Sequence, residues 1–389
     1  MRGRLRYDDV VLCAPVTVPY ERYSSQSAHW WAGRALRVLA DVTGLGPRDF
    51  DGFCFSSFSA GPDTAVGMVQ HLGLSPRWLD HIPTGGASGV MAMRRAARAV
   101  QCGDAQIVAC VAADTNHLDS FRQTVAGFSR FSQDAVYPYG SGGPNATFAL
   151  ITDHYMRTFG IGREAFGKLC VAQRDNARSN PLALQRGVLT LDAYLNARPI
   201  SDPVHLYDCV MPCAGADAYI VTTPEVAQRL GLRMVRILST IERHNAHPQD
   251  KVQWRGGWTM DVDDLWAMAG VGPQDVDVLQ VYDDYPVIVA MQIDNLGFCP
   301  PGEVADFIRR TDFTITGDLP LNTNGGQLSA GQAGAAGGFQ NVTEGMRQIL
   351  RQPLGDQVPD ARIAAISGFG LVNYDRGICT AAAVLEAVA

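Results

Sequence analysis

Residues 44–51, GLGPRDFD, recur with few changes at residues 270–277 as GVGPQDVD. Each copy follows an amphipathic stretch that contains tryptophan, and each precedes a strand-like run, GFCFSSF in the first case and VLQVYDDY in the second. The shared order of three features favours duplication of one α/β unit over a chance match between short turn-rich strings. The repeat therefore predicts an α/β fold made of two similar halves.

Each half also contains a Gly-Gly turn that precedes a helix-like segment. The turns are TGGASG at 84–89 and NGGQLSAG at 324–331. After the first turn, Val90, Met93 and Ala97 have the spacing of one buried helix face. We expect both turns to meet at one cleft between the halves.

Residues 115–205 interrupt the duplicated pattern. Gly, Pro and Asn separate short helical segments there, and a loop-rich region of this length usually serves function. We expect 115–205 to be an insertion over the cleft. The chain then divides into 1–114 as the first part of the N-terminal half, 206–232 as the end of that half, and 233–389 as the C-terminal half.

Composition narrows the class of protein. The chain has 389 residues, of which 47% are hydrophobic, and no apolar run approaches the ~18 residues of a membrane span. The start, MRGRLRYDDVVLC, lacks the apolar stretch of a secretory signal. Nine cysteines without a repeated spacing fit reduced thiols. With a net charge of -7, we expect a cytoplasmic protein without a nucleic-acid partner or membrane insertion.

Metal and iminium chemistry lack support in the sequence. Only two of the 32 basic residues are lysines, one in a helical pattern and one in a polar loop, so neither resembles a desolvated Schiff-base amine. The histidines of HNAH at 244–247 and the cysteines of CVMPC at 209–213 have no further ligands at a suitable spacing. We expect no metal and no permanently bound cofactor.

Four longer stretches carry a family resemblance. They are GGASG at 85–89, RDNARSNPLALQRGVLTLDAYLNARPISDPVHLYDC at 174–209, VYDDYPVIVAMQIDNLGFCPPGE at 281–303 and LPLNTNGGQLSAGQAGAAGG at 319–338. In these the chain resembles the thiolase superfamily, within it the sterol-carrier-protein-2 thiolase-like, or lipid-transfer-protein, branch. The resemblance implies a layered αβαβα core, a homodimer and a coenzyme A thioester as substrate.

The departures from the thiolase pattern concern the reacting groups. Gly86 stands where thiolases have the acylated cysteine, and Gln332, in GQAG, stands where they have the histidine of Gly-His-Pro. Ser367, in SGFG, replaces the thiol of Cys-x-Gly, and Tyr282 leads the YDDY box. The resemblance therefore implies that no covalent acyl-enzyme forms.

One group of the branch shares this pattern, namely the retro-aldolases of steroid side-chain degradation. They have glycine at the nucleophile position and tyrosine at the start of the second-half box, and they act with a DUF35-type protein, a small zinc-ribbon and OB-fold partner. They use a second tyrosine where this chain has Gln332. The resemblance implies an aldol-type lyase acting on a β-hydroxyacyl-CoA. The alternatives are a catalytically silent subunit that binds acyl-CoA or scaffolds a partner, and an acyltransferase that uses another cysteine.

Retro-aldol cleavage needs a base for the hydroxyl proton, a stabilised enolate and an acid. With the resemblance, Tyr282 is the candidate for proton transfer, Gln332 for a neutral enolate donor and Tyr374 for a second acid. Adjacent side chains on a strand point to opposite faces, so we expect one of Asp283 and Asp284 to face the substrate and the other to cap the following helix. Asp283 is the candidate.

The glycine turns are the expected binding elements. Free main-chain N–H groups at a helix start can hold an oxyanion, and the missing side chain at residue 86 would leave room for the substrate. The predicted substrate-binding residues are Gly86, Ser88, Asn322, Gly326, Ser367 and Gly370.

Overall fold

The computed structural model describes residues 6–61, 65–117, 134, 137–140 and 143–388. The predicted insertion therefore includes residues 118–133, 135–136 and 141–142, which lie outside the described residues. None of the described helices is both long enough and apolar enough to cross a lipid bilayer.

Strands from the whole chain join in one mixed sheet. The N-terminal strands are β1 (Val11–Glu21), β2 (Gly52–Ser56), β3 (Trp78–His81), β4 (Ile107–Asp114) and β7 (Ala214–Thr222). The C-terminal strands are β8 (Val235–His244), β9 (Val278–Val281), β10 (Ile363–Asn373) and β11 (Arg376–Ala387). Their order is β3-β2-β4-β7-β1-β8-β11-β10-β9, and only β2 with β3, β2 with β4, and β9 with β10 are parallel. Two residue pairs between β1 and β8 connect the two sets.

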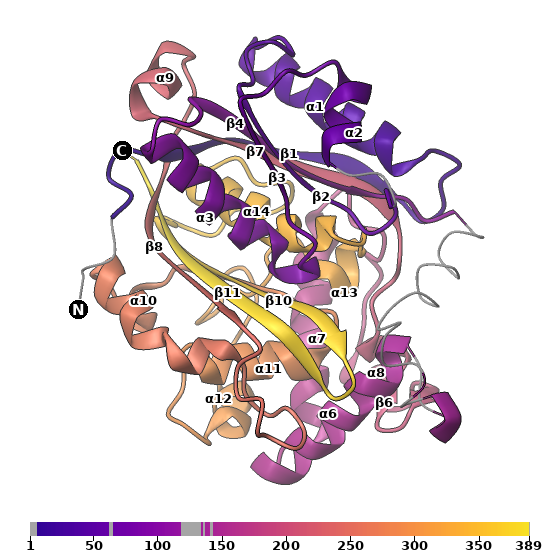
Figure 1. Ribbon diagram of the computed structural model, residues 1–389. Helices are drawn as coiled ribbons and strands as arrows, with labels where there is room; N and C mark the ends of the chain where they lie inside the picture. The colour runs from indigo at the N-terminus through magenta and orange to yellow at the C-terminus, as the bar shows by residue number, and fades with distance from the viewer. Residues whose placement is uncertain (1–5, 62–64, 118–133, 135–136, 141–142, 389) are drawn as a thin grey trace.

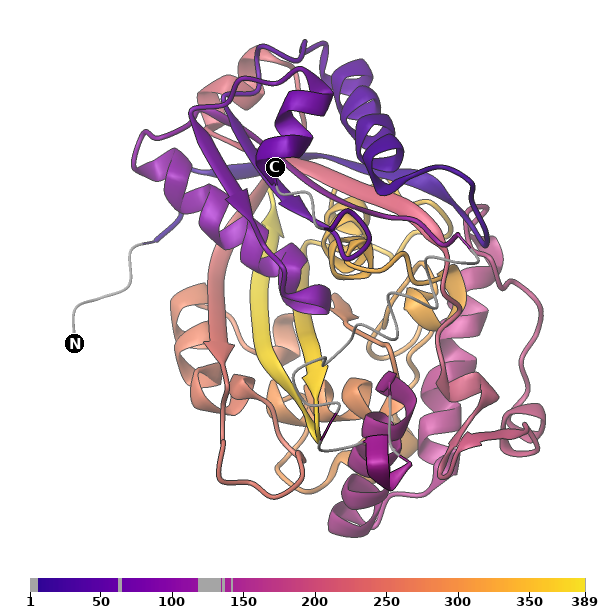
Figure 2. The same ribbon diagram turned by 45° about the vertical axis from the view of Figure 1, so that its right-hand side comes forward.

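Helices separate and cover the two sets of strands, which gives five layers (Figure 1). The outer helices of the first set are α1 (Ala28–Thr43), α2 (Ala65–Leu72) and α9 (Pro224–Arg229). The central helices are α3 (Ser88–Gln101) and α14 (Ala336–Ile349). Below the second set lie α10 (Val262–Ala269), α11 (Pro286–Asn295) and α12 (Val304–Arg310). Figure 2 shows the central helices between the strands, where they form the core of the molecule.

The two copies of the repeat fold alike. Gly44 caps the end of α1 and Gly270 caps the end of α10, both in the left-handed conformation. The Asp51 carboxylate accepts from main-chain N–H groups at the start of β4 at 2.8 Å, and Asp277 accepts from those at the start of β10 at 2.8 and 2.9 Å. Each aspartate thus ties the strand after its repeat to the neighbouring strand, as duplication predicts.

The central helices differ from the sequence expectation at one point. The Gly-Gly turn at 324–331 leads only into α13 (Gly326–Ala330), whereas the long counterpart of α3 is α14, which follows the GQAG segment. Helices α3 and α14 touch through their backbones, because a Cβ at Gly89 would overlap the carbonyl of Gly338. This crossing brings residue 86 and residue 332 to the same region.

The described part of the insertion packs mainly on the C-terminal half. It contains α6 (Gly143–Phe159), α7 (Arg163–Asn176), α8 (Leu191–Leu195) and the short strands β5 (Pro199–Ser201) and β6 (Val204–His205). Helix α7 lies beside α11, α12 and α13, and α6 lies beside β10 and β11 (Figure 1). The start of α6 reaches the cavity described next.

Candidate active site

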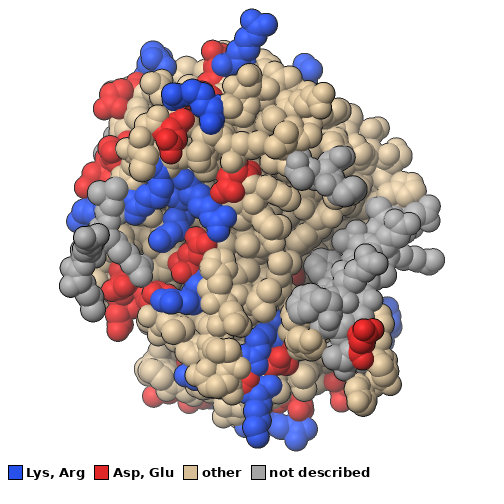
Figure 3. Space-filling view, viewed as in Figure 1, with Lys and Arg blue, Asp and Glu red and all other residues tan. Residues whose placement is uncertain are grey.

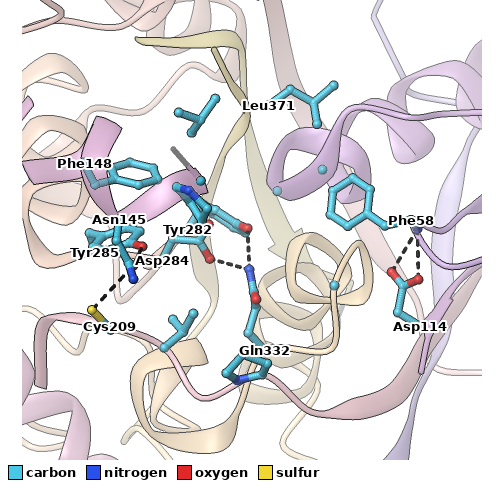
Figure 4. A pocket seen from close by; sticks show the side chains of 18 of the residues that line it. Phe58, Asp114, Asn145, Phe148, Cys209, Tyr282, Asp284, Tyr285, Gln332 and Leu371 are labelled. Atoms are coloured by element: carbon cyan, nitrogen blue, oxygen red, sulfur yellow. Dashed lines mark hydrogen bonds between the residues drawn. The ribbon is translucent and has the colours of Figure 1, made fainter. Parts of the chain in front are cut away.

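A cavity of about 350 Å³ lies between the halves and the start of α6 (Figure 4). Its walls come from segments far apart in the sequence, namely 58–59, 85–86, 114–116, 143–148, 209–213, 282–285, 332–334 and 369–372. Of the predicted site residues, Gly86, Tyr282 and Gln332 line it. The cavity therefore lies at the first glycine turn, where the sequence predicted a cleft.

The Tyr282 ring fills the space above Gly86. Tyr282 follows β9, and its main-chain N–H donates to the Ser367 carbonyl at 3.1 Å. A Cβ at Gly86 would overlap the Cε2 and Cζ atoms of the ring and also the Phe369 carbonyl oxygen. The missing side chain at residue 86 thus makes room for the tyrosine, not for the substrate as the sequence suggested.

The side chains of Tyr282, Gln332 and Asp284 form one polar cluster. The Gln332 Nε2 group donates to the Tyr282 hydroxyl at 3.2 Å and to Asp284 Oδ1 at 2.6 Å (Figure 4). Tyr282 and Asp284 thus share one donor, and each influences the pKa of the other. Tyr282 is almost fully buried, while Gln332 and Asp284 are half-buried. Asp284 lines the cavity, and the sequence had not selected it.

Burial shifts the proton equilibria of this cluster. It raises the pKa of Asp284 to about 7, an effect to which the charge of Asp283 adds and which the Tyr282 hydroxyl and the Gln332 amide oppose. Burial, with the charge of Asp284, raises the pKa of Tyr282 well above its ordinary value. Near neutral pH Tyr282 is therefore protonated, whereas Asp284 can gain or lose a proton.

Asp283 points away from the cavity. Its carboxylate accepts from the main-chain N–H groups of Gln327 at 2.9 Å and Leu328 at 3.1 Å. It therefore caps α13 instead of the helix that follows it in sequence, α11. Burial raises the pKa of Asp283 to about 7. The alternation of side chains thus separates the pair, with Asp284 on the cavity side.

The other predicted site residues hold the framework and do not line the cavity. The side chain of Asn322 bonds to both main-chain groups of Val281 and so braces the end of β9. Ser88 donates to a carbonyl just before α14, and Ser367 donates to a buried glutamine of α11. Each hydroxyl or amide is used within the protein.

Gly326, Gly370 and Tyr374 also lie outside the cavity wall. A Cβ at Gly326 would overlap the Asp283 carboxylate, and one at Gly370 would overlap the carbonyl of Thr84, so both glycines permit close packing. Tyr374 lies between β10 and β11 with 43% of its surface exposed. Its carbonyl accepts from the hydroxyl of Thr147, at 2.9 Å.

Asp114 lies at the opposite end of the cavity (Figure 4). Its carboxylate accepts from the N–H groups of Phe58 at 2.9 Å, Ser59 at 2.7 Å and Ala335 at 2.6 Å. It thereby ties the loop after β2 to the segment that carries Gln332. Asp114 was not among the residues predicted from the sequence, although an aspartate at the end of the apolar run IVACVAAD is a usable signal.

The remaining wall is mostly apolar. Phe148 of α6 stacks on Tyr285 with 3.9 Å between ring centroids, and Leu371 contributes to the wall on the side of Phe58 (Figure 4). The Tyr285 hydroxyl donates to Asn145, which also belongs to α6 and lines this wall. Such a surface suits an acyl group with few polar substituents.

Comparison with known proteins shows the family to which this chain belongs. The model of the thiolase C-terminal domain-like family matches residues 254–381. The 17-hydroxy-3-oxo-4-pregnene-20-carboxyl-CoA lyase of Mycobacterium tuberculosis is 31% identical over 338 residues, which are 82% of this chain and 85% of the relative. This chain belongs to the thiolase superfamily. Within it, the chain lies in the sterol-carrier-protein-2 thiolase-like branch.

One further relative and one solved structure are similar to this chain over most of its length. The steroid side-chain-cleaving aldolase of Thermomonospora curvata is 29% identical over 330 residues, covering 81% of this chain and 83% of the relative. The solved structure of "Ltp2-ChsH2(DUF35) aldolase" superposes with a TM-score of 0.82 at 24% identity and covers 98% of each chain. The five-layer arrangement of the thiolase-like chain is therefore the thiolase fold.

Proposed function

We propose that this chain is a carbon–carbon bond lyase of aldol type that acts on a β-hydroxyacyl-CoA thioester. The observation that carries the proposal is the position of Tyr282, whose ring occupies the space above Gly86 while its hydroxyl joins a polar cluster in the cavity. The lyase and aldolase names of the relatives support the same reaction class.

The cavity is poorly suited to acyl transfer. Its wall includes two thiols, those of Cys209 and Cys213. Burial raises the pKa of Cys209 to about 12 and raises that of Cys213 well above its ordinary value. Because the thiolate is the nucleophilic form, neither cysteine is activated, which disfavours the acyltransferase alternative.

In the proposed cleavage, each wall of the cavity has one role. The proton of the β-hydroxyl goes through the Tyr282 hydroxyl to the polar cluster that includes Asp284. The O–H electron pair forms the new C=O bond, the electron pair of the broken Cα–Cβ bond becomes an enolate, and a carbonyl product leaves. Main-chain N–H groups of the turn at Gly85 and Gly86, which lines the cavity, are the proposed partners of the enolate oxygen. The apolar wall around Phe148 holds the acyl group.

Product analysis tests the proposal. The full-length chain is incubated with a β-hydroxyacyl-CoA that carries a tertiary hydroxyl, and the mixture and the intact protein are examined by mass spectrometry. We expect a ketone and a shortened acyl-CoA, with no acyl mass on the protein. A protein that gains the acyl mass would be an acyltransferase, and one that binds the thioester without product would be the silent subunit.

We also propose a DUF35-type partner, a homodimer and a cytoplasmic location. The partner is motivated by the structural neighbour, whose name includes DUF35, and by the pairing of basic side chains that could otherwise hold CoA phosphates. Basic side chains gather over α3 together with acidic ones (Figure 3), but Arg94 and Arg95 are ion-paired with Glu242, Arg95 at 3.0 Å. The homodimer rests on the family, and the location rests on nine free cysteines in the described chain.

Co-expression decides on the partner. The chain is produced with and without a DUF35-type protein, and size-exclusion chromatography and CoA-thioester affinity are compared. We expect the complex to be more stable and to bind more tightly. Full activity of a monodisperse chain without any partner would contradict this part of the proposal.

A further inference from the structure

Gln332 determines the direction of the hydrogen bonds in the Tyr282 cluster. An amide nitrogen carries two hydrogens, and the Nε2 group of Gln332 directs them to Asp284 at 2.6 Å and to Tyr282 at 3.2 Å. The reverse orientation of the amide would place its oxygen against the Asp284 carboxylate. Both hydrogens are therefore committed, so Gln332 does not serve as the enolate donor expected from the sequence.

The hydroxyl of Tyr282 then has one defined arrangement. A phenolic oxygen has one hydrogen and two lone pairs, and Gln332 occupies one lone pair. The ionised Asp284 carboxylate can only accept, and Gln332 holds it beside the Tyr282 hydroxyl through a shared donor, so we expect the Tyr282 hydrogen to turn toward Asp284. One lone pair remains, and toward a substrate hydroxyl in the cavity Tyr282 can act only as an acceptor.

We infer that Asp284 is the proton acceptor of the reaction and that Tyr282 passes the substrate's proton to it. This inference rests on the proposed lyase function and extends it to a residue that the sequence analysis had not selected. Tyrosine alone is a poor base near neutrality, whereas a carboxylate beside it, bridged to it by Gln332, completes the transfer.

The β-hydroxyl O–H bond breaks and its proton goes to the Tyr282 oxygen, while the Tyr282 proton moves to an oxygen of Asp284. The O–H electron pair forms the new C=O bond, and the Cα–Cβ pair becomes the enolate of the CoA thioester. The enolate carbon then takes up one proton and Asp284 releases one, so the site returns to its initial state.

Among the described residues, few groups near Asp284 titrate around neutral pH. Besides Tyr282 and Asp283, the titratable side chains whose pKa values the charge of Asp284 affects are Tyr285 at the start of α11 and Cys209 in the loop before β7. Burial raises the pKa values of both Tyr285 and Cys209, to about 12 for Cys209. Between pH 5 and 9 the two aspartates therefore control the charge of this cluster.

The test compares Asp284→Asn with Asp283→Asn, which changes the adjacent carboxylate outside the cavity. Full-length proteins, with the partner if one is required, are assayed for kcat and KM from pH 5 to 9 after a thermal melt. We expect Asp284→Asn to lower kcat by ~10²–10⁴-fold with little change in KM. In the wild type kcat should fall toward acid pH, with a midpoint near the value of about 7 given by burial.

The Asp283→Asn control distinguishes the effect of a lost negative charge from the loss of the proton acceptor. Asp283→Asn should keep kcat at pH 8 within a few-fold and move the acid midpoint to lower pH, because the neighbouring charge is gone. Asp284→Glu should recover part of the rate. Wild-type kcat in Asp284→Asn, or an unmoved midpoint in Asp283→Asn, would overturn the relay while the lyase remains. A wild type without lyase activity would overturn both.

Discussion

At the scale of single residues, the side-chain sizes at positions 282 and 86 depend on each other. The glycine is required because the tyrosine ring lies where its Cβ would be, and the ring in turn presents its hydroxyl to Gln332 and Asp284. The change of a nucleophilic cysteine to glycine is thus coupled to the presence of a large side chain opposite. Chemistry that needs a side chain at residue 86 and chemistry that uses the Tyr282 hydroxyl exclude each other in this geometry.

Tyr282→Phe should lower turnover much more than Gln332→Ala. Phenylalanine keeps the ring above Gly86 but removes the proton-transfer atom, an effect of ~10²–10⁴-fold. Gln332→Ala leaves the Tyr282 hydroxyl and the Asp284 carboxylate in the cavity wall, so we expect a loss smaller than ~10²-fold. Single-turnover kinetics with a melt of each variant measures both. A Phe variant that retains most of the rate would move the proton transfer to another group.

Gly86→Ala should lower both stability and activity. The added Cβ meets the Tyr282 ring and the Phe369 carbonyl, and overpacking of this kind costs about 1–3 kcal/mol or more. Gly187→Ala is the matched control, since a Cβ there has nothing within 4 Å. Denaturant melts of the two variants are compared. Equal stability of the pair would mean that residue 86 can move away from the ring.

At the scale of elements, the crossing of α3 and α14 positions the site. The two helices approach through backbone at Gly89 and Gly338. Helix α3 follows the turn that carries Gly86, and α14 follows the segment that carries Gln332. A change in the spacing of these helices would therefore separate the two walls of the cavity that hold the reacting groups.

Gly89→Ala tests this crossing. Its Cβ would overlap the carbonyl of Gly338, so we expect a loss of stability of about 1–3 kcal/mol and a lower kcat. Gly33→Ala, in the interior of α1, is the control, because its Cβ would meet only the Leu72 side chain at 3.4 Å. Removing a helix-interior glycine there should stabilise by up to ~1 kcal/mol. Thermal melts that rank the two variants in the reverse order would refute the close crossing.

At the scale of the whole molecule, buried carboxylates make stability depend on pH. Burial raises the pKa values of Asp283 and Asp284 to about 7, well above the ~3.9 of an unfolded chain. Burial also raises the pKa values of Asp114, Asp217 and Glu344. A raised pKa gives stability that is complete below the unfolded-state value and is lost as pH rises through the folded-state value.

The melting temperature should therefore be lower at pH 8 than at pH 5. The unfolded state ionises first as the pH rises, and its population gains. Asp284→Asn should reduce the difference, since one of the raised groups is gone. Calorimetry at both pH values provides the measurement, with Asp8→Asn, an exposed carboxylate, as control. A wild type that melts higher at pH 8 would show that these buried carboxylates do not dominate.

The sequence by itself determined the duplication, the family and the loss of the nucleophile. These follow from local patterns, since the repeat at 44–51 and 270–277 specifies the same helix end and the same strand pairing in each half. The identity of residue 86 excludes an acylated cysteine at that position without any structure. The placement of Tyr282 in the site also follows from its position after an apolar strand, together with the resemblance.

Only the tertiary structure decided which groups share the cavity. The alternation of side chains separates Asp283 from Asp284, but the approach of α13 to one of them and of Gln332 to the other makes Asp283 a cap and Asp284 a cavity residue. In the same way, the space at Gly86 is filled by a residue nearly 200 positions later. Contacts between segments so far apart are set by how helices and strands pack, and local sequence pattern carries no record of that packing.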